Sequence, residues 1–271
     1  MNDGTIISQF LKAKDINHHL QTIDELSLRD ALYLITLIRS SVVISSEAYI
    51  GPFTSVPPIF PDIRPHNDGI GVNHLIDRNL ITLSQYAFID ENSEVKELYF
   101  NDTKWKVNIE DFEEALLQIN EIITSAVWPV KWRYDIKRVW LEIAILECRQ
   151  YLEYLANERD INIEITDEIQ NIFLTLLRNN SVSQCFSLMH DAVCEASDNF
   201  FRKIISIDDI GNNFIQCLFN NRNKTHGSKE DSRPVNIPQS QLSYIFHYEF
   251  LKIGEAGFTA IPHDMTCPKK I

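Results

Sequence analysis

The sequence predicts a mainly α protein, in which a small N-terminal α+β module over residues 1–107 precedes a helical bundle over residues 108–271. Three observations predict this fold class. Five of the ten prolines fall within residues 52–65, and such a density breaks helices and central strands, so this stretch is expected to be an extended connector. Segments with β-strand character occur before residue 108. Beyond that residue, apolar side chains recur almost throughout at helical spacing.

In the N-terminal module, a helix is expected over about residues 5–20 and a second one after Ser27. Ser27 and Asp30 have the spacing of a capping box, in which each side chain bonds an otherwise unpaired amide of the other residue. After the connector, residues 71–83 predict a short helix that runs directly into a strand, and residues 99–107 offer further strands. This helix–strand order resembles the last helix and wing of winged-helix domains, although a junction in another α+β fold explains it equally well.

In the C-terminal part, Asn108 is expected to cap a helix whose acidic first turn suits the positive end of the helix dipole. Its predicted buried stripe is Phe112, Leu116, Ile119 and Ile123. Further helices are expected over 135–155, 166–178 with Thr166 as cap, 182–200, 210–218, and from Asn236 and Pro238 to Ile253 before Gly254. Three aromatic residues near the start of the bundle are expected to be exposed: Trp128, Trp132 and Tyr134.

The charge of the chain favours a protein partner over a nucleic acid. With 25 basic and 38 acidic residues the net charge is −13, and residues 1–125 carry 9 − 19 = −10 of it. Binding to a phosphate backbone depends on Lys and Arg, so nucleic-acid binding is disfavoured without being excluded. A basic protein partner, or simply solubility, explains the acidity better. The sequence leaves the oligomeric state open.

Localisation is expected to be cytoplasmic. No apolar run approaches the roughly 18 residues that a membrane-spanning helix needs, and the first residues do not have the pattern of a signal peptide. The five cysteines are widely spaced without a C-x-x-C pair, which favours reduced thiols. Abundant Ile and Asn beside only eight glycines are typical of A+T-rich genes, a bias that suggests a bacterial or mobile-element origin and, on that ground alone, an antiviral defence role.

Motifs that hold nucleotides or catalyse hydrolysis are absent from the sequence. It contains no G-x-G-x-x-G, no P-loop, no G-x-S-x-G and no H-E-x-x-H. We therefore expect no cofactor, and the absence of these motifs favours, without establishing, a protein that has no enzymatic activity.

One enzymatic alternative depends on Arg222 and His226, in the segment Arg-Asn-Lys-Thr-His-Gly that follows an apolar helix. This segment resembles the Arg-Asn…His-Gly signature of HEPN-type ribonucleases, which are all-helical and act as dimers. The resemblance implies that His226 acts as acid or base on the ribose 2′-hydroxyl and that Arg222 steadies the phosphate. Here three residues separate the pair, whereas the family has four to six. The other interpretation is a solvated loop over residues 220–234.

Three further groups of side chains have features of a site but are expected to be structural. His190 and Cys194 stand four apart on one predicted helix, but no close second pair completes a zinc site, so a core histidine and a buried thiol are favoured. The dipeptides at residues 190–191 and 263–264 match the metal-binding pair of HD phosphohydrolases only by two letters. Glu142 and Glu147 diverge around their helix and cannot face one substrate; Glu142 is expected to pair with Arg138.

A winged-helix regulator is the second alternative. Asn73, His74, Arg78 and Asn79 could face a DNA groove, but no basic stripe supports them, so contact with protein is favoured.

A last resemblance covers more of the chain. Residues 180–184, residues 238–241 and residues 251–258 are similar to the C-terminal part of a family of uncharacterised bacterial proteins. That family has no known activity, so the resemblance implies only an intact helical domain. The leading hypothesis is a non-enzymatic cytosolic accessory or regulatory subunit of a bacterial assembly.

Overall fold

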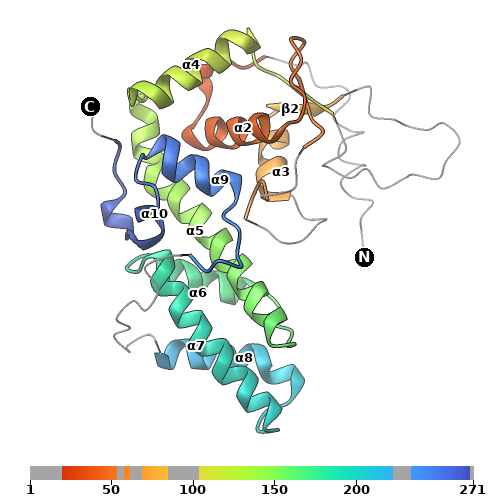
Figure 1. The fold of residues 1–271 in the computed structure, drawn as a ribbon, viewed down its shortest axis with the longest axis vertical. Helices are drawn as coiled ribbons and strands as arrows, with labels where there is room; N and C mark the ends of the chain where they lie inside the picture. Colours follow the sequence, from red (N-terminus) through yellow and green to blue (C-terminus); the bar gives the residue numbers. More distant parts are fainter. Residues whose placement is uncertain (1–19, 54–57, 62–68, 85–103, 222–232, 269–271) are drawn as a thin grey trace, which may run out of the picture. The chain divides into compact units, whose positions relative to one another are not determined.

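The computed structural model describes residues 20–53, 58–61, 69–84, 104–221 and 233–268 (Figure 1). The chain forms two compact units. The first comprises residues 1–56 and 66–124, and the second comprises residues 57–65 and 125–271. The sequence-based domain limits at residues 107 and 108 stay a prediction, because grouping by contacts does not define domains that fold independently.

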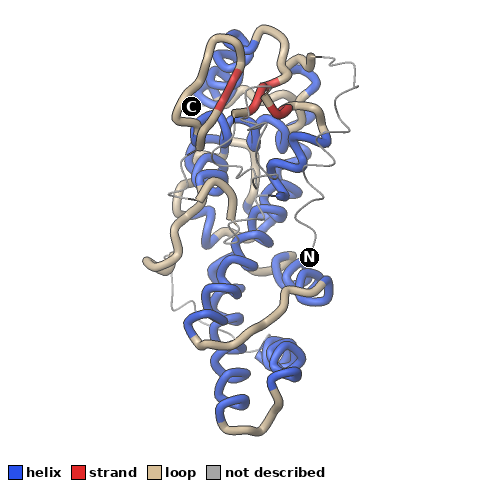
Figure 2. Tube along the Cα trace, turned by 90° about the vertical axis from the view of Figure 1, so that its right-hand side faces the viewer, coloured by secondary structure: helices blue, strands red, loops and turns tan. Residues whose placement is uncertain are grey.

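The first unit combines helices with a small antiparallel sheet. Its helices are α2 (Leu28–Ser40), α3 (Gly69–Asp77) and α4 (Phe112–Ser125), preceded by the short 3₁₀ turn η2 (Ile23–Glu25). The strands β1 (Tyr49–Ile50), β2 (Ile81–Leu83) and β3 (Trp105–Val107) lie in the order β1-β3-β2. Ile50 pairs with Trp105, and Ile81 pairs with Val107. Figure 2 shows that the strands lie together in a largely helical molecule. The predicted fold class, mainly α with a small α+β module, is confirmed.

Local sequence signals account for most of this unit. The capping box of Ser27 and Asp30 is present, with both reciprocal hydrogen bonds. The predicted helix–strand junction is confirmed by α3 and β2, which are joined through Asn79 in the left-handed conformation at φ 55°. Its side chain makes this tolerable, since Asn adopts that region more readily than most residues. The short strand β1 was not predicted.

The predicted start of α4 is wrong. Asn108 is buried and does not cap a helix; its side-chain amide donates to the carbonyl of Asn79 at 3.1 Å, and its backbone accepts from Gln21. Asp111 then has φ 46°, which is incompatible with a right-handed helix, so α4 begins at Phe112. Its buried residues are Phe112, Ala115, Ile119 and Ile123, with Ala115 in place of the expected Leu116.

The second unit is built around α5 (Val130–Glu158), the longest described helix. Three helices pack against it or against each other: α6 (Asp167–Leu177), α7 (Val182–Phe201) and α8 (Ile210–Asn221), the last preceded by the turn η4 (Ile207–Asp209). Thr166 caps α6 as predicted, and α7 and α8 lie within two residues of their predicted ranges except at the end of α8. The most extensive helix pair joins α7 to α8 (Figure 1).

The predicted helix from Asn236 to Ile253 is wrong in its extent and type. Ser240 caps α9 (Gln241–Tyr244), which continues as a π-helix, η5 (Ile245–Phe250). Pro238 lies before the cap. Gly254 ends the segment in the left-handed conformation at φ 57°, with its amide bonded to the carbonyl of His247. The short elements α10 (Ala256–Thr259) and η6 (Pro262–Asp264) follow.

Aromatic residues dominate the core around the start of α5. Trp128 and Trp132 are 2% and 0% exposed, so the prediction that they are exposed is wrong, whereas Tyr134 is confirmed at 82%. Both tryptophans contact Phe250 of η5, with ring centroids 5.7 and 6.3 Å apart. Because the indoles enclose an aromatic side chain, truncating Trp132 to Ala is expected to cost about 3–5 kcal/mol.

Candidate interaction site

Arg222 and His226, the residues of the ribonuclease hypothesis, lie outside the described residues. Helix α8 ends at Asn221, immediately before them. Their proposed catalytic roles stay a prediction.

His190 and Cys194 lie on one face of α7, but the arrangement does not suit a metal. The sulfur of Cys194 accepts a hydrogen bond from an Arg159 guanidinium nitrogen at 2.8 Å, and a cation in that position competes with a metal ion. Burial raises the pKa of Cys194, which keeps the thiol protonated. The side chain of His190 is 52% exposed, so the expectation of a core histidine is wrong. Within the described residues, no three His, Cys, Asp or Glu side chains could hold a metal ion together.

Most of the residues that the winged-helix alternative would turn towards DNA have intramolecular partners in the first unit. His74 Nε2 lies 2.6 Å from Asp30 Oδ1, and Arg78 lies 3.6 Å from the other oxygen of the same buried carboxylate. Asn79 contacts Asn108 at the junction after α3. Asn73 is exposed. Three of these four side chains therefore help to hold α3 against α2 and the sheet.

A buried polar cluster in the second unit was missed by the sequence analysis. It consists of Glu147 on α5, Arg233, Ser243 on α9 and His247 on η5, and we call it the Glu147 cluster. Arg233 Nη2 lies 2.6 Å from Glu147 Oε1, and the Ser243 hydroxyl donates to the same oxygen at 2.6 Å. The Ser243 oxygen lies 3.4 Å from His247 Nδ1. The Arg233 guanidinium also stacks 4.8 Å above the ring of Phe258.

The geometry of the Glu147 cluster is structural and not that of a nucleophilic triad. In a triad the histidine separates the hydroxyl from the carboxylate, whereas here the carboxylate bonds the hydroxyl directly. Ser243 is fully buried, so a substrate cannot reach its oxygen. Burial lowers the pKa of His247 to about 4, so the imidazole is neutral at pH 7. The sequence pattern pairs Glu147 only with Glu142 on the same helix. Its true partners come from residues 86 and 96 positions further along the chain.

Arg138 likewise has a different partner from the one expected. It bonds Asp135 Oδ1 at 2.9 Å on the surface of α5.

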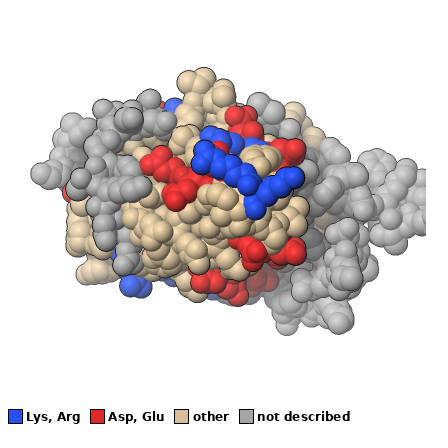
Figure 3. Space-filling model, turned by 90° about the horizontal axis from the view of Figure 1, so that it is seen from below, with Lys and Arg blue, Asp and Glu red and all other residues tan. Residues whose placement is uncertain are grey.

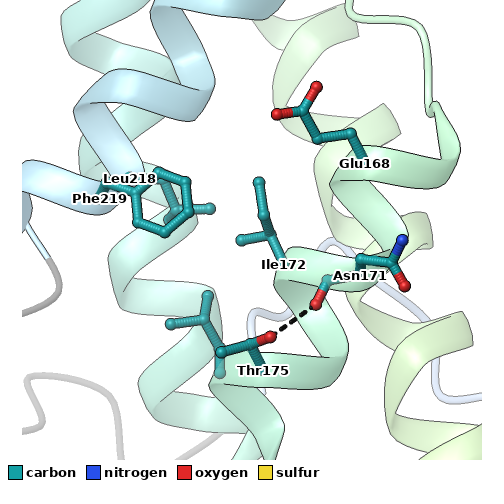
Figure 4. A pocket seen from close by; sticks show the side chains of 7 residues that line it. Glu168, Asn171, Ile172, Thr175, Leu218 and Phe219 are labelled. Atoms are coloured by element: carbon teal, nitrogen blue, oxygen red, sulfur yellow. Dashed lines mark hydrogen bonds between the residues drawn. The ribbon is translucent and has the colours of Figure 1, made fainter.

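A groove of about 450 Å³ lies between α6 and α8 (Figure 4). Helix α6 contributes Glu168, Asn171, Ile172, Thr175 and Leu176, and α8 contributes Leu218 and Phe219. In Figure 4, Ile172 and Phe219 face the gap from opposite sides, and Glu168 lies at one end. The groove therefore has an apolar middle and a carboxylate at its rim. We call it the α6–α8 groove.

The turn that joins α7 to α8 exposes three large apolar side chains within seven residues. Phe201, Ile204 and Ile207 are 58%, 65% and 64% exposed. The turn is fixed by Lys203 in the left-handed conformation and by the amide of Ile204, which bonds the carbonyl of Asn199. Contiguous exposed apolar side chains mark interaction surfaces more often than isolated ones do. We call these three residues the α7–α8 turn.

Charges around the described helices are mixed in sign. The view in Figure 3 shows a central group of Lys and Arg side chains and a few further ones at the edges, with groups of Asp and Glu between them and a largely uncharged remainder among the described atoms. Part of this charge is paired, since Asp198 lies within 4.0 Å of both Arg159 and Arg202. The described atoms of this view thus form no continuous basic track for a phosphate backbone.

Comparison with protein-family models, with curated proteins and with solved structures gave no match. Within the described part of the chain, no helix combines the length and apolarity that crossing a bilayer requires.

Proposed function

We propose that this chain is a non-enzymatic accessory or regulatory subunit that binds another protein. The exposed apolar α7–α8 turn carries this proposal. Transferring its three side chains from water into an interface is favourable by roughly 25 cal/mol for each Å² of apolar surface covered. Phe201, Ile204 and Ile207 are exposed within seven residues of the chain, and grouped exposed apolar side chains mark interaction surfaces more often than scattered ones do.

Charge and chemistry support a protein partner. The net charge of −13 opposes binding to nucleic acids, and the Glu147 cluster, which contains the best-connected buried polar groups, is closed to substrates. We place the protein in the cytoplasm, because its five cysteines, all of them within the described residues, form no disulfide.

The experiment is affinity recovery of the full tagged chain from its native source, with and without three substitutions in the turn. The wild type is expected to recover one protein in near-stoichiometric amount, without RNA or DNA. The triple variant Phe201→Ser, Ile204→Ser, Ile207→Ser should lose that protein while keeping its circular dichroism spectrum, because the replaced side chains are exposed.

A double variant provides the matched control. Tyr134→Ser with Val235→Ser removes two exposed large side chains, 82% and 99% accessible, from elsewhere in the chain and should leave recovery unchanged. Recovery of nucleic acid alone, or equal recovery by the triple variant, would contradict the proposal.

A further inference from the structure

We propose that the α6–α8 groove binds a helical segment of a partner protein, and that this segment places a Lys or Arg beside an apolar stripe. The inference rests on the proposed function in taking the ligand to be a protein. It concerns a different surface from the α7–α8 turn, so the two can fail separately.

The lining residues on α6 share one face of that helix, which gives a ridge against which a second helix can pack. They stand at residues 168, 171, 172, 175 and 176, which are positions i, i+3, i+4, i+7 and i+8 of one helix face. Side chains at this spacing form the ridge that packs against a second helix. The strip rises about 12 Å over its eight steps, or a little over two helical turns. A partner helix of three or four turns can therefore lie along α6, with α8 as the opposite wall.

The middle of the groove offers exposed apolar surface among the described residues. Phe219 is 43% exposed, although Phe214 on the same helix is fully buried against the core. Ile172 and Leu218 line the groove beside it and are largely buried, at 8% and 1% exposed. In complexes where a helix binds in a groove, aromatic side chains are common anchors of the contact, and the groove takes up several apolar side chains of the bound helix.

The rim of the groove favours a basic residue in the ligand. The carboxylate of Glu168 is exposed, and no described residue forms an ion pair or hydrogen bond with it. By contrast, Asp198 on α7 is paired with Arg159 and Arg202. Asp167 and Glu164 are acidic and exposed as well, but neither lines the groove, so Glu168 is the acidic residue that a ligand in the groove would meet. A Lys or Arg placed there is attracted by the carboxylate of Glu168, whereas a Gln is attracted only weakly and a Glu is repelled.

A second copy of this chain is a poorer occupant. Each copy carries a net charge of −13, so two copies repel each other, and the acidic rim offers no complementary charge to an identical rim. A basic amphipathic helix satisfies both the apolar middle and the acidic end.

The test uses purified full-length chain and a library of helical peptides of about 14 residues, or four turns. Each peptide has Leu at positions i, i+3, i+4 and i+7, and the flanking positions vary among Lys, Gln and Glu. Selection is expected to enrich peptides with Lys next to the Leu stripe. Affinities of the enriched peptide and of its Lys→Glu counterpart are then measured by fluorescence anisotropy.

Charge reversal in the groove should reverse the preference for charge. Glu168→Lys is expected to weaken the Lys peptide by about tenfold and to bind the Glu counterpart more tightly than the wild type does. The matched control is Asp167→Lys, which makes the same change of charge in the same first turn of α6, at a residue that does not line the groove. It should leave both affinities within about twofold of those of the wild type, because exposed charges outside the contact are screened.

Removal of the aromatic anchor gives a second, independent readout. Phe219→Ser should weaken the Lys peptide by tenfold or more, whereas Tyr134→Ser, which removes an exposed ring elsewhere, should not. The inference is overturned if selection shows no preference for Lys, if Glu168→Lys and Asp167→Lys have equal effects, or if the wild type self-associates and Phe219→Ser abolishes that association. None of these outcomes affects the recovery experiment on the α7–α8 turn, so failure of the groove and failure of the proposed function are distinguishable.

Discussion

Removing the Arg233 side chain tests how the Glu147 cluster stabilises the second unit. In Arg233→Met the carboxylate of Glu147, which is 2% exposed, loses its counterion and keeps only the Ser243 hydroxyl on the same oxygen. Leaving one member of a buried ion pair without its partner costs about 3–5 kcal/mol. The methionine retains most of the apolar stem, so lost packing contributes little.

Two further variants separate the ion pair from its setting. Glu147→Leu combined with Arg233→Met removes both charges and should return to within about 1–2 kcal/mol of the wild type, because no charge remains buried. Arg138→Met breaks the exposed pair with Asp135, where the arginine is 56% exposed, and should cost under about 1 kcal/mol.

Urea unfolding followed by tryptophan fluorescence measures these differences in free energy. Trp128, Trp132 and Trp140 are buried in the second unit and report its unfolding. A loss below about 1 kcal/mol for Arg233→Met would refute the reasoning, since the smallest expected effect is about 3 kcal/mol. A double variant as unstable as the single one would refute it as well.

Three other predictions concern pH and close packing. Burial lowers the pKa of His247 from 6.5 to about 4. Between these two pH values the unfolded chain binds a proton at this histidine and the folded chain does not. The free energy of unfolding should therefore fall by up to about 3 kcal/mol as the pH is lowered from 6.5 to 4. His247→Gln should flatten this dependence in urea unfolding at pH 7 and pH 5, and an unchanged slope would contradict it. Burial alone raises the pKa of Asp30, but hydrogen bonds from His74 and from the cap of its own helix outweigh burial and lower it to about 2. The stabilisation from the lowered pKa of Asp30 is present above pH 4 and disappears as the pH falls to 2. Asp30→Asn should therefore lower the free energy of unfolding by about 2 kcal/mol at pH 7 and by little at pH 2. Equal losses at both pH values would count against this prediction. A Cβ on Gly257 would lie 2.5 Å from the His247 ring, so Gly257→Ala should cost about 1–3 kcal/mol in thermal unfolding, whereas Gly211→Ala, with open space around the site, should be neutral or stabilising.

Sequence patterns predicted those elements whose signals are local. The cap at Thr166 and the apolar repeat of α7 each depend on residues within a few turns, and the structure confirms both. The prediction for Asn108 is wrong because its side chain makes a non-local contact. Asn is a common helix cap, but the side chain of Asn108 bonds Asn79, which lies 29 positions earlier in the chain.

The parts that sequence patterns missed are held by contacts between distant segments. Trp132 lies on the first turns of α5 beside the exposed Tyr134, and nothing in the local sequence distinguishes the two; burial of the indole depends on Phe250, more than a hundred residues later. The Glu147 cluster is assembled in the same way from α5 and the C-terminal segments. The helices that line the α6–α8 groove were predicted, but the gap depends on how both pack against α7, which periodicity does not encode.

The path of the chain through the second unit affects when this unit can form during synthesis. The carbonyls of Pro58 and Ile59 accept hydrogen bonds from the amides of Gln241 and Leu242, and Ile59 and Phe60 are buried there. The segment that contains Pro58 and Ile59 therefore cannot form these hydrogen bonds until residues about 180 positions later have been synthesised. Closing so long a loop is slow, which leaves those apolar side chains exposed on the nascent chain. A fragment that starts at residue 108 lacks this segment and should be prone to aggregate.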